Sequence, residues 1–180
     1  MLCVGYLGEL VEQSIGPERF GVQIAYSFDG AEPLGTLGAV RNAASLLGDR
    51  FLVLYGDTYL RIDYGAAAAA WRRSGLPAMM SVLRNEGRWD ASNVSFDGEV
   101  VTAYDKRNPT GEMDWIDYGF GGFRAAALDA VEGEISDLAD LYSELANRRL
   151  LFGYAATERF YEIGTPEALA ETSTFLTVDG

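Results

Sequence analysis

Two acidic residues and one basic residue stand at the ends of apolar segments, where their side chains could do chemistry on a phosphate. Asp57 follows the apolar run Phe51–Tyr55 and Gly56, and Glu162 lies in a second apolar segment near the C-terminus. These two carboxylates could share one Mg²⁺, which needs only one or two protein carboxylates besides water and substrate phosphate. Lys106 is the single lysine among 14 basic residues, and an ammonium group is a compact point charge that can follow a phosphate through a reaction.

Each of these residues also has an ordinary structural interpretation. An aspartate at a strand end commonly caps a helix or forms a turn, and a lone lysine in a turn is commonly just solvated. The run before Asp57 favours a functional role, because a continuous apolar run is typical of a central parallel strand covered on both faces. Ligands of open α/β sheets bind beyond the carboxyl ends of such strands.

Two glycine-containing segments offer further binding groups. Leu34-Gly35-Thr36-Leu37-Gly38 leads into a helical pattern; its glycines would let a ligand approach the backbone, and a helix N-terminus attracts negative or electron-rich groups. The alternative is a plain helix start with Thr36 as its N-cap. Asp117-Tyr118-Gly119 offers a carboxylate and a close backbone to sugar hydroxyls, unless its glycine marks a β-bulge.

Strand and helix periodicities alternate along the whole chain, and the elements that they predict must position these groups. Strands are predicted at 2–7, 22–26, 51–55, 79–83, 94–96, 100–104, 116–123, 150–155 and 160–163, with a hairpin turn at Asp97-Gly98. Helices are predicted at 9–15, 36–47, 66–73, 125–131, 137–147 and from Pro166 onward. This order predicts an α/β fold with a Rossmann-like mixed, mainly parallel sheet, helices on both faces, and one domain over residues 1–180.

Composition excludes several classes of protein. The chain has no histidine, so it holds no Ser-His-Asp triad, no His-assisted cysteine and no His-ligated zinc. A formal net charge of -13 argues against nucleic acid or an anionic membrane as a partner. Cys3, the single cysteine, is predicted to be a small core residue in a reducing compartment. Because the sequence shows no membrane-spanning apolar run and no signal peptide, a cytoplasmic location is expected.

Taken in order, these segments resemble the sugar-1-phosphate nucleotidylyltransferases, and most closely the branch that acts on mannose-, glucose- or heptose-1-phosphates. Residues Tyr26 to Ala39 resemble the family's Y-x-x-E-x-x-P-L-G-T-A-G-A block, and Phe51 to Asp57 its strand ending in G-D. Asp105-Lys106-Arg107 resembles E-K-P, Asp117 to Gly121 resembles N-x-G-x-Y, and Glu162 to Pro166 resembles D-I-G-T-P. The resemblance covers nearly the whole chain.

The resemblance implies a Mg²⁺-dependent reaction in which a sugar 1-phosphate attacks the α-phosphate of a nucleoside triphosphate and pyrophosphate leaves. It implies that Asp57 and Glu162 hold the metal and that Asp57 and Lys106 are catalytic, with Lys106 on the sugar phosphate. The substrate-binding residues that it implies are Leu34, Gly35, Thr36, Gly38, Gly56, Asp105, Lys106, Asp117 and Gly119. Because family members often form oligomers, it also implies a homo-oligomer, although the sequence shows no interface.

Several positions depart from the family pattern. Glu162 replaces an Asp, and Asp105 and Asp117 replace a Glu and an Asn. Asn93 stands where many relatives have a Gly, so the sugar preference is open. The family's G-x-G-T-R loop and P-K pair, which hold the triphosphate, have no counterpart in this sequence. The chain is therefore expected to be an incomplete copy that lacks a strand inside the sheet, to bind nucleoside triphosphate poorly and to turn over little or not at all.

Other functions fit part of the pattern. A non-catalytic sugar-phosphate-binding or regulatory homologue would keep the fold without the triphosphate loop. A metal-dependent glycosyltransferase would usually show D-x-D, and a dinucleotide-binding module would show G-x-G-x-x-G; this sequence has neither motif. Calorimetry with each substrate separately distinguishes the first of these from an enzyme.

Overall fold

The structure, a computed structural model, describes residues 1–89, 91–131 and 137–178. Its strands are β1 (Leu2–Val4), β2 (Glu18–Arg19), β3 (Val22–Gln23), β4 (Tyr26–Phe28), β5 (Arg50–Leu54), β6 (Thr58–Tyr59), β7 (Ala78–Arg84), β8 (Val94–Phe96), β9 (Val101–Tyr104), β10 (Trp115–Arg124), β11 (Leu151–Ala156) and β12 (Tyr161–Glu162). Its helices are α1 (Gly8–Ile15), α2 (Gly35–Ala43), α3 (Tyr64–Ser74), α4 (Leu138–Asn147) and α5 (Pro166–Val178), with 3-10 turns η1 (Ala44–Leu46) and η2 (Ala125–Ala130). The predicted elements all have counterparts, although the predicted helix at 125–131 is the 3-10 turn η2.

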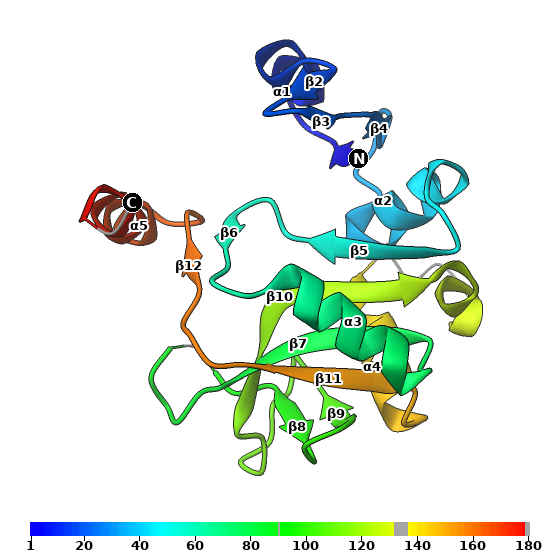
Figure 1. The fold of residues 1–180 in the computed structure, drawn as a ribbon, viewed down its shortest axis with the longest axis vertical. Coiled ribbons are helices and arrows are strands. Elements are labelled where there is room, and N and C mark those ends of the chain that lie inside the picture. The colour runs from blue at the N-terminus through cyan, green and yellow to red at the C-terminus, as the bar shows by residue number, and fades with distance from the viewer. Residues whose placement is uncertain (90, 132–136, 179–180) are drawn as a thin grey trace.

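The main sheet has the strand order β11-β7-β10-β8-β9, and β5 also pairs with β10. Only the β11–β7 pair of this sheet is parallel among the pairs that the described ranges form. The predicted mixed α/β class is confirmed, but the expectation of mainly parallel pairing is wrong for this sheet. The strands β1 and β4 form a separate parallel pair, which Figure 1 shows above the sheet together with α1 and the β2–β3 hairpin.

Helices cover both faces of the main sheet, as predicted. The central strand β7 is buried on both sides, because alternate side chains of a strand point to opposite faces. Met79 packs in the cluster that contains Trp71 of α3, whereas Met80 packs in the cluster that contains Leu141 of α4. Figure 1 shows α3 in front of the sheet and α4 behind it. None of the helices in the described ranges is long and apolar enough to cross a bilayer.

The strand β5 has an open edge. It pairs with β10 in antiparallel register, and on its other side no strand within the described parts of the chain pairs with it. Leu52 and Leu54 are 43% and 48% exposed. The prediction of a central parallel strand covered on both faces is therefore wrong for β5, whose apolar run borders a groove instead.

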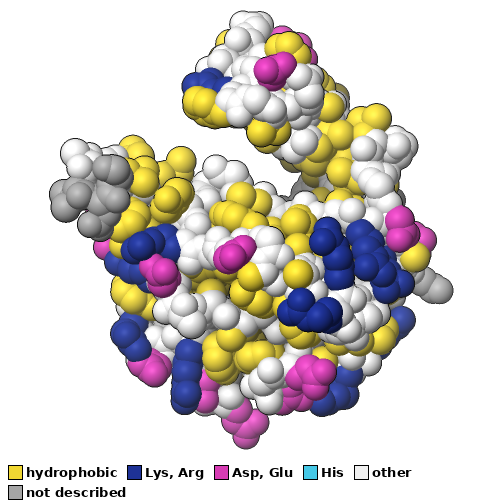
Figure 2. All heavy atoms as spheres, in the orientation of Figure 1, with side chains coloured by type: hydrophobic (Ala, Val, Ile, Leu, Met, Phe, Trp, Pro, Cys, Tyr) yellow, Lys and Arg dark blue, Asp and Glu magenta, His cyan; other side chains and the backbone are white. Residues whose placement is uncertain are grey.

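This groove, here called the β1–β5 groove, has a volume of about 290 Å³ and runs between residues 1–3 and β5. Figure 2 shows the hollow between the N-terminal unit, which consists of β1–β4 and α1, and the rest of the molecule, with hydrophobic side chains exposed along it. Cys3 lies in the groove and is exposed, so the prediction of a small core residue is wrong. The reason is that the groove leaves one side of β1 uncovered; the Cys3 thiol donates to the Ala39 carbonyl at 3.7 Å.

Candidate functional site

The candidate site lies where the strand partners of β10 diverge. Along one edge of β10, β8 pairs at Trp115 and β5 pairs from Phe120 onward. The stretch between them contacts loop residues instead of a strand: the Asp117 N–H donates to Asn93 Oδ1 at 3.1 Å, and Gly119 O accepts from the Tyr55 N–H at 3.4 Å. The ends of β5, β8 and β9 therefore meet at this gap in the sheet.

A β-bulge in β10 shapes the gap. The β10–β7 register shifts between Asp117 and Gly121, and Gly119 between them has φ +87°, a conformation that glycine adopts without strain. The Gly119 N–H donates to Asp117 Oδ1 at 2.9 Å. The bulge alternative from the sequence is thus confirmed, and the same bulge holds the Asp117 carboxylate at the gap.

A cavity of about 230 Å³, here called the central pocket, opens at this place. It is lined by Tyr55, Asp57, Thr58, Asn93, Tyr104, Lys106, Asp117, Tyr118, Gly119, Phe160 and Glu162. Of the site residues predicted from the sequence, the structure brings Asp57, Lys106, Asp117, Gly119 and Glu162 together here. They come from the ends of β5, β9 and β12 and from the bulge in β10, four segments that are far apart in the chain.

The two predicted metal ligands lie at the β6–β12 pair, with Glu162 in β12 and Asp57 directly before β6. Glu162 stands opposite Thr58 in the antiparallel β12–β6 pair, and the Ile163 N–H donates to the Asp57 carbonyl at 3.0 Å. Thr58 Oγ1 donates to Asp57 Oδ1 at 3.1 Å. The Glu162 side chain has no hydrogen bond or ion pair with the part of the chain that the structure describes, while Thr172 Oγ1 holds its backbone carbonyl at 2.7 Å.

This pair of carboxylates has the oxygen chemistry that Mg²⁺ prefers. Both side chains are exposed at the pocket, so water and a substrate phosphate can reach the same cation. Among the described residues there is no group of three or more His, Cys, Asp or Glu side chains that could hold a metal. A cation at Asp57 and Glu162 would therefore complete its coordination with water and substrate.

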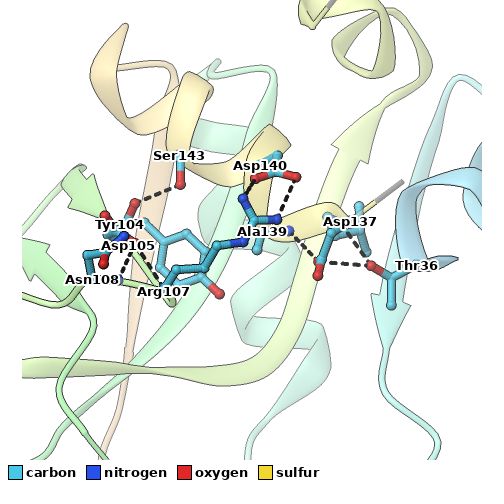
Figure 3. Close-up of polar contacts among 10 residues, drawn as sticks. Thr36, Tyr104, Asp105, Arg107, Asn108, Asp137, Ala139, Asp140 and Ser143 are labelled. Atoms are coloured by element: carbon cyan, nitrogen blue, oxygen red, sulfur yellow. Dashed lines mark hydrogen bonds and ion pairs between the residues drawn. The ribbon is translucent and has the colours of Figure 1, made fainter. Parts of the chain in front are cut away.

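Lys106 sits in a turn that its two neighbours hold in place. Asp105 Oδ1 accepts from the Arg107 and Asn108 N–H groups at 2.9 and 2.8 Å. The Arg107 guanidinium pairs with both carboxylate oxygens of Asp140 in α4, at 2.9 and 3.1 Å, as Figure 3 shows. Lys106 itself forms no ion pair with any other residue in the described ranges, so its ammonium group is available to an anion in the pocket.

Other predicted site residues do not line the central pocket. The carboxylate of Asp105 closes its own turn. Thr36 and Gly56 line the β1–β5 groove, which meets the central pocket at Tyr55. The predicted site residues that line neither cavity are Leu34, Gly35, Gly38 and Asp105.

Thr36 is not the N-cap of its helix. The helix α2 starts one residue earlier, at Gly35, and its cap position is Leu34. The Thr36 hydroxyl donates to Asp137 Oδ1 at 3.2 Å and accepts from the Leu138 N–H at 2.8 Å (Figure 3). The N-cap alternative is therefore wrong, and Thr36 ties the start of α2 to the start of α4.

Burial controls the charge state of the groups around the pocket. It raises the pKa of Asp117, and the Gly119 N–H, the Lys106 charge and the Tyr104 hydroxyl partly offset that rise. Burial also raises the pKa values of Tyr55, Tyr104 and Tyr142, with nearby carboxylates adding to the effect. The wall of the pocket therefore keeps its phenol groups protonated far above neutral pH.

We expect this layer of buried tyrosines to make the protein unstable in alkali. Burial raises the pKa of Tyr118 to about 12, whereas tyrosines of the unfolded chain ionise near pH 10, so above about pH 10 the unfolded state has lost protons that the folded state keeps. The contribution of these tyrosines to the free energy of unfolding should be complete below about pH 10 and should fall as the pH rises toward 12. Urea unfolding at pH 8, 10 and 11, with phenolate absorbance at 295 nm, measures this. A stability that stays constant while the tyrosines ionise would contradict it; with one lysine in the chain, lysine deprotonation adds little.

Sequence reasoning missed the aromatic and hydroxyl groups of the pocket. Tyr55, Thr58, Tyr104 and Phe160 line it but were not predicted as site residues. Each lies within two positions of a residue that was predicted, which is the one signal that could have found them.

Known proteins are similar to this chain in sequence. No family model matches the chain. N-acetylmuramate alpha-1-phosphate uridylyltransferase from Neisseria meningitidis serogroup B is 29% identical over 170 residues, which cover 92% of this chain and 73% of that protein. D-glycero-alpha-D-manno-heptose 1-phosphate guanylyltransferase from Campylobacter jejuni is 36% identical over 63 residues, which cover 35% of this chain and 28% of that protein.

The fold has solved counterparts. A crystal structure of a Bacillus anthracis protein, assigned as a glucose-1-phosphate thymidylyltransferase and solved with sucrose, matches with a TM-score of 0.78 at 15% identity, over 93% of this chain and 71% of that one. At that identity the likeness speaks to the fold alone. The curated relatives add the sequence match, and both are sugar-1-phosphate nucleotidylyltransferases by name. In sequence, this chain is similar to sugar-1-phosphate nucleotidylyltransferases, and its fold matches that of a protein assigned as one.

Proposed function

We propose that the chain's reaction joins a nucleoside monophosphate, taken from a nucleoside triphosphate, to a sugar 1-phosphate and releases pyrophosphate, and that this chain alone turns over slowly because its sequence has no counterpart of the family's G-x-G-T-R loop and P-K pair. An oxygen of the sugar phosphate would form a bond to the α-phosphorus, and the bond from that phosphorus to the bridging oxygen of the pyrophosphate would break. The observation that carries this proposal is the central pocket, where an ammonium group without an ion pair among the described residues and two exposed carboxylates line the same cavity. Such a transfer depends on positioning and charge neutralisation, which these groups can provide without histidine.

The charges of the pocket support a requirement for a cation. Asp57, Asp117 and Glu162 line it together with the single ammonium of Lys106, so a phosphate would meet a mainly negative wall. We propose Mg²⁺ at Asp57 and Glu162; when bound, it would neutralise phosphate charge and orient the reacting oxygens. Lys106 would hold the sugar phosphate, and Asp117 beside Gly119 would address the sugar hydroxyls.

The nucleotide would lie in the β1–β5 groove, next to the sugar phosphate in the central pocket. The β1–β5 groove meets the central pocket at Tyr55 and carries Thr36 and Gly56 on its wall, which supports placing base and ribose on that side, near the start of α2. We also propose a cytoplasmic location, which the single cysteine of the sequence supports as a sign of a reducing compartment.

We expect Glu162→Gln to lower the apparent affinity for Mg²⁺ by roughly 10- to 100-fold, because one of two ligating carboxylates loses its charge. The measurement is calorimetric binding of glucose 1-phosphate at increasing Mg²⁺, with EDTA as the zero point. Glu167→Gln is the matched control, since Glu167 is exposed in the first turn of α5 and outside the pocket. An unchanged Mg²⁺ dependence in Glu162→Gln would show that the cation lies elsewhere.

The proposed activity is tested by pyrophosphate release from each nucleoside triphosphate in the presence of Mg²⁺ and a sugar 1-phosphate. Release that depends on the sugar 1-phosphate would establish the reaction. A second candidate is a non-catalytic sugar-phosphate-binding homologue, and one observation favours it. Lys106 is the only cation on the described wall of the central pocket. One cation suits the single phosphate of a sugar 1-phosphate better than that phosphate together with the three of a nucleoside triphosphate. Binding of sugar 1-phosphate without pyrophosphate release would select this candidate, and the absence of both would reject the two together.

A further inference from the structure

A second cavity adjoins the central pocket. This cavity, here called the outer pocket, has a volume of about 440 Å³ and shares Phe160 and Glu162 with the central pocket. Its other walls are Arg88 and Trp89 from the loop after β7, Arg159 before β12, and Ala168 and Glu171 from α5. A sugar whose phosphate lies at Lys106 would therefore have room to extend past Phe160 into the outer pocket.

The wall of the outer pocket is held rigidly by Arg159. Its guanidinium lies 4.2 Å from the ring centre of Trp89 and 4.4 Å from that of Tyr161, and it forms a bidentate pair with Glu171 at 2.7 and 3.1 Å. Its Nε–H donates to the Phe160 carbonyl at 3.2 Å. A cation over the faces of two aromatic rings gains favourable electrostatic contact with both. These contacts join the loop after β7, β12 and α5 into one preformed surface.

The arginines of the outer pocket are paired. Arg159 pairs with Glu171 and Arg88 pairs with Glu86, so neither guanidinium is left as an unpaired charge that would draw in an anion. The one lining charge without an ion pair in the described chain is that of Glu162, the proposed Mg²⁺ ligand, which the outer pocket shares with the central pocket. A guanidinium has five N–H donors; the three contacts of Arg159 leave two of them without a partner in the described chain. Trp89 is still 42% exposed. The pocket thus offers donors, acceptors and an aromatic surface to a neutral ligand.

We propose that the outer pocket receives a neutral acylamino substituent of the sugar and makes the protein select N-acylated sugar 1-phosphates over plain hexose 1-phosphates. An acylamino group has one N–H donor, one carbonyl acceptor and an apolar end. These match a carboxylate, a guanidinium and the Trp89 indole, which are the three kinds of group on this wall. The inference rests on the proposed function, because it assumes that the sugar phosphate occupies the central pocket.

The test compares N-acetylglucosamine 1-phosphate with glucose 1-phosphate by calorimetry in the presence of Mg²⁺. The wild type should bind the N-acetylated sugar roughly 10-fold more tightly, the effect of one small group in a fitted pocket. Trp89→Ala should lose that preference while keeping its affinity for glucose 1-phosphate, and Trp89→Phe should retain most of it. Phe20→Ala is the matched control, since Phe20 is an aromatic residue that is 93% exposed on the distant β2–β3 hairpin.

Each result decides the inference. A wild type that binds both sugars equally, or a Trp89→Ala variant that weakens both equally, would overturn it and leave the proposed function standing. Failure of the wild type to bind either sugar phosphate would overturn both. Circular dichroism confirms that the variants are folded, and the two sugars serve as each other's control within one variant.

Discussion

Replacing Lys106 with alanine should weaken the binding of a sugar 1-phosphate by roughly 10- to 100-fold, the worth of a hydrogen bond to a charged group. Lys106 is the only cation on the described wall of the central pocket, where three carboxylates also lie. Because the turn that carries it is fixed by Asp105 and by the Arg107–Asp140 pair, the lost charge cannot be replaced by a small shift of the backbone. Calorimetry with glucose 1-phosphate and Mg²⁺ measures the loss.

Two variants make this test specific. Arg73→Ala removes one positive charge from the exposed end of α3 and should leave the affinity unchanged, which separates a local contact from a change in net charge. Lys106→Arg should recover only part of the affinity, since a planar guanidinium does not replace a compact ammonium group in every geometry. Equal affinity for glucose 1-phosphate in the wild type and in Lys106→Ala would show that the phosphate does not bind at this site.

Replacing Gly121 with alanine should destabilise the fold by about 1–3 kcal/mol, the usual cost of overfilling a well-packed core. A Cβ at this position of β10 would overlap the Tyr142 hydroxyl and come within 3.2 Å of the Met79 carbonyl. Tyr142 cannot move aside easily, because it is 4% exposed and its ring packs against Phe123 and Tyr104. Urea unfolding followed by far-UV circular dichroism measures the change.

The control for this substitution is Gly48→Ala, because a Cβ there would meet no atom within 4 Å and should change the stability by less than about 0.5 kcal/mol. Tyr142→Phe in the Gly121→Ala background should restore part of the loss, since it removes the overlapping hydroxyl but not the ring. Wild-type stability of Gly121→Ala would mean that Tyr142 packs differently.

The elements could be predicted from the sequence because their signals are local. Asp97-Gly98 indicated the β8–β9 hairpin, Pro166 indicated the start of α5, and the apolar run at 51–55 indicated β5. Each rests on the conformational preferences of a few neighbouring residues. The partners of β5 could not be predicted in the same way, because an apolar run fits a buried central strand and a strand beside an apolar groove equally well.

The candidate site was predicted in part for the same reason. Asp57, Lys106 and Glu162 stand at strand ends, and strand ends can be located from local patterns. Asp105 follows the end of β9 and Thr36 lies in the first turn of α2, yet their side chains bond to a neighbouring turn and to the start of α4. Whether a polar side chain lines the pocket or bonds to another part of the protein depends on tertiary contacts. A single sequence does not show those contacts.

The open edge of β5 has a consequence for how the protein behaves at high concentration. An unpaired strand edge is a template on which another chain can add, and many proteins guard such edges with lysine, proline or a bulge. After Arg50, β5 has only apolar side chains, and its register with β10 is regular. At high protein concentration, molecules should therefore associate strand to strand through β5. Low concentration, low temperature and a small amount of denaturant are the storage conditions that should keep them apart.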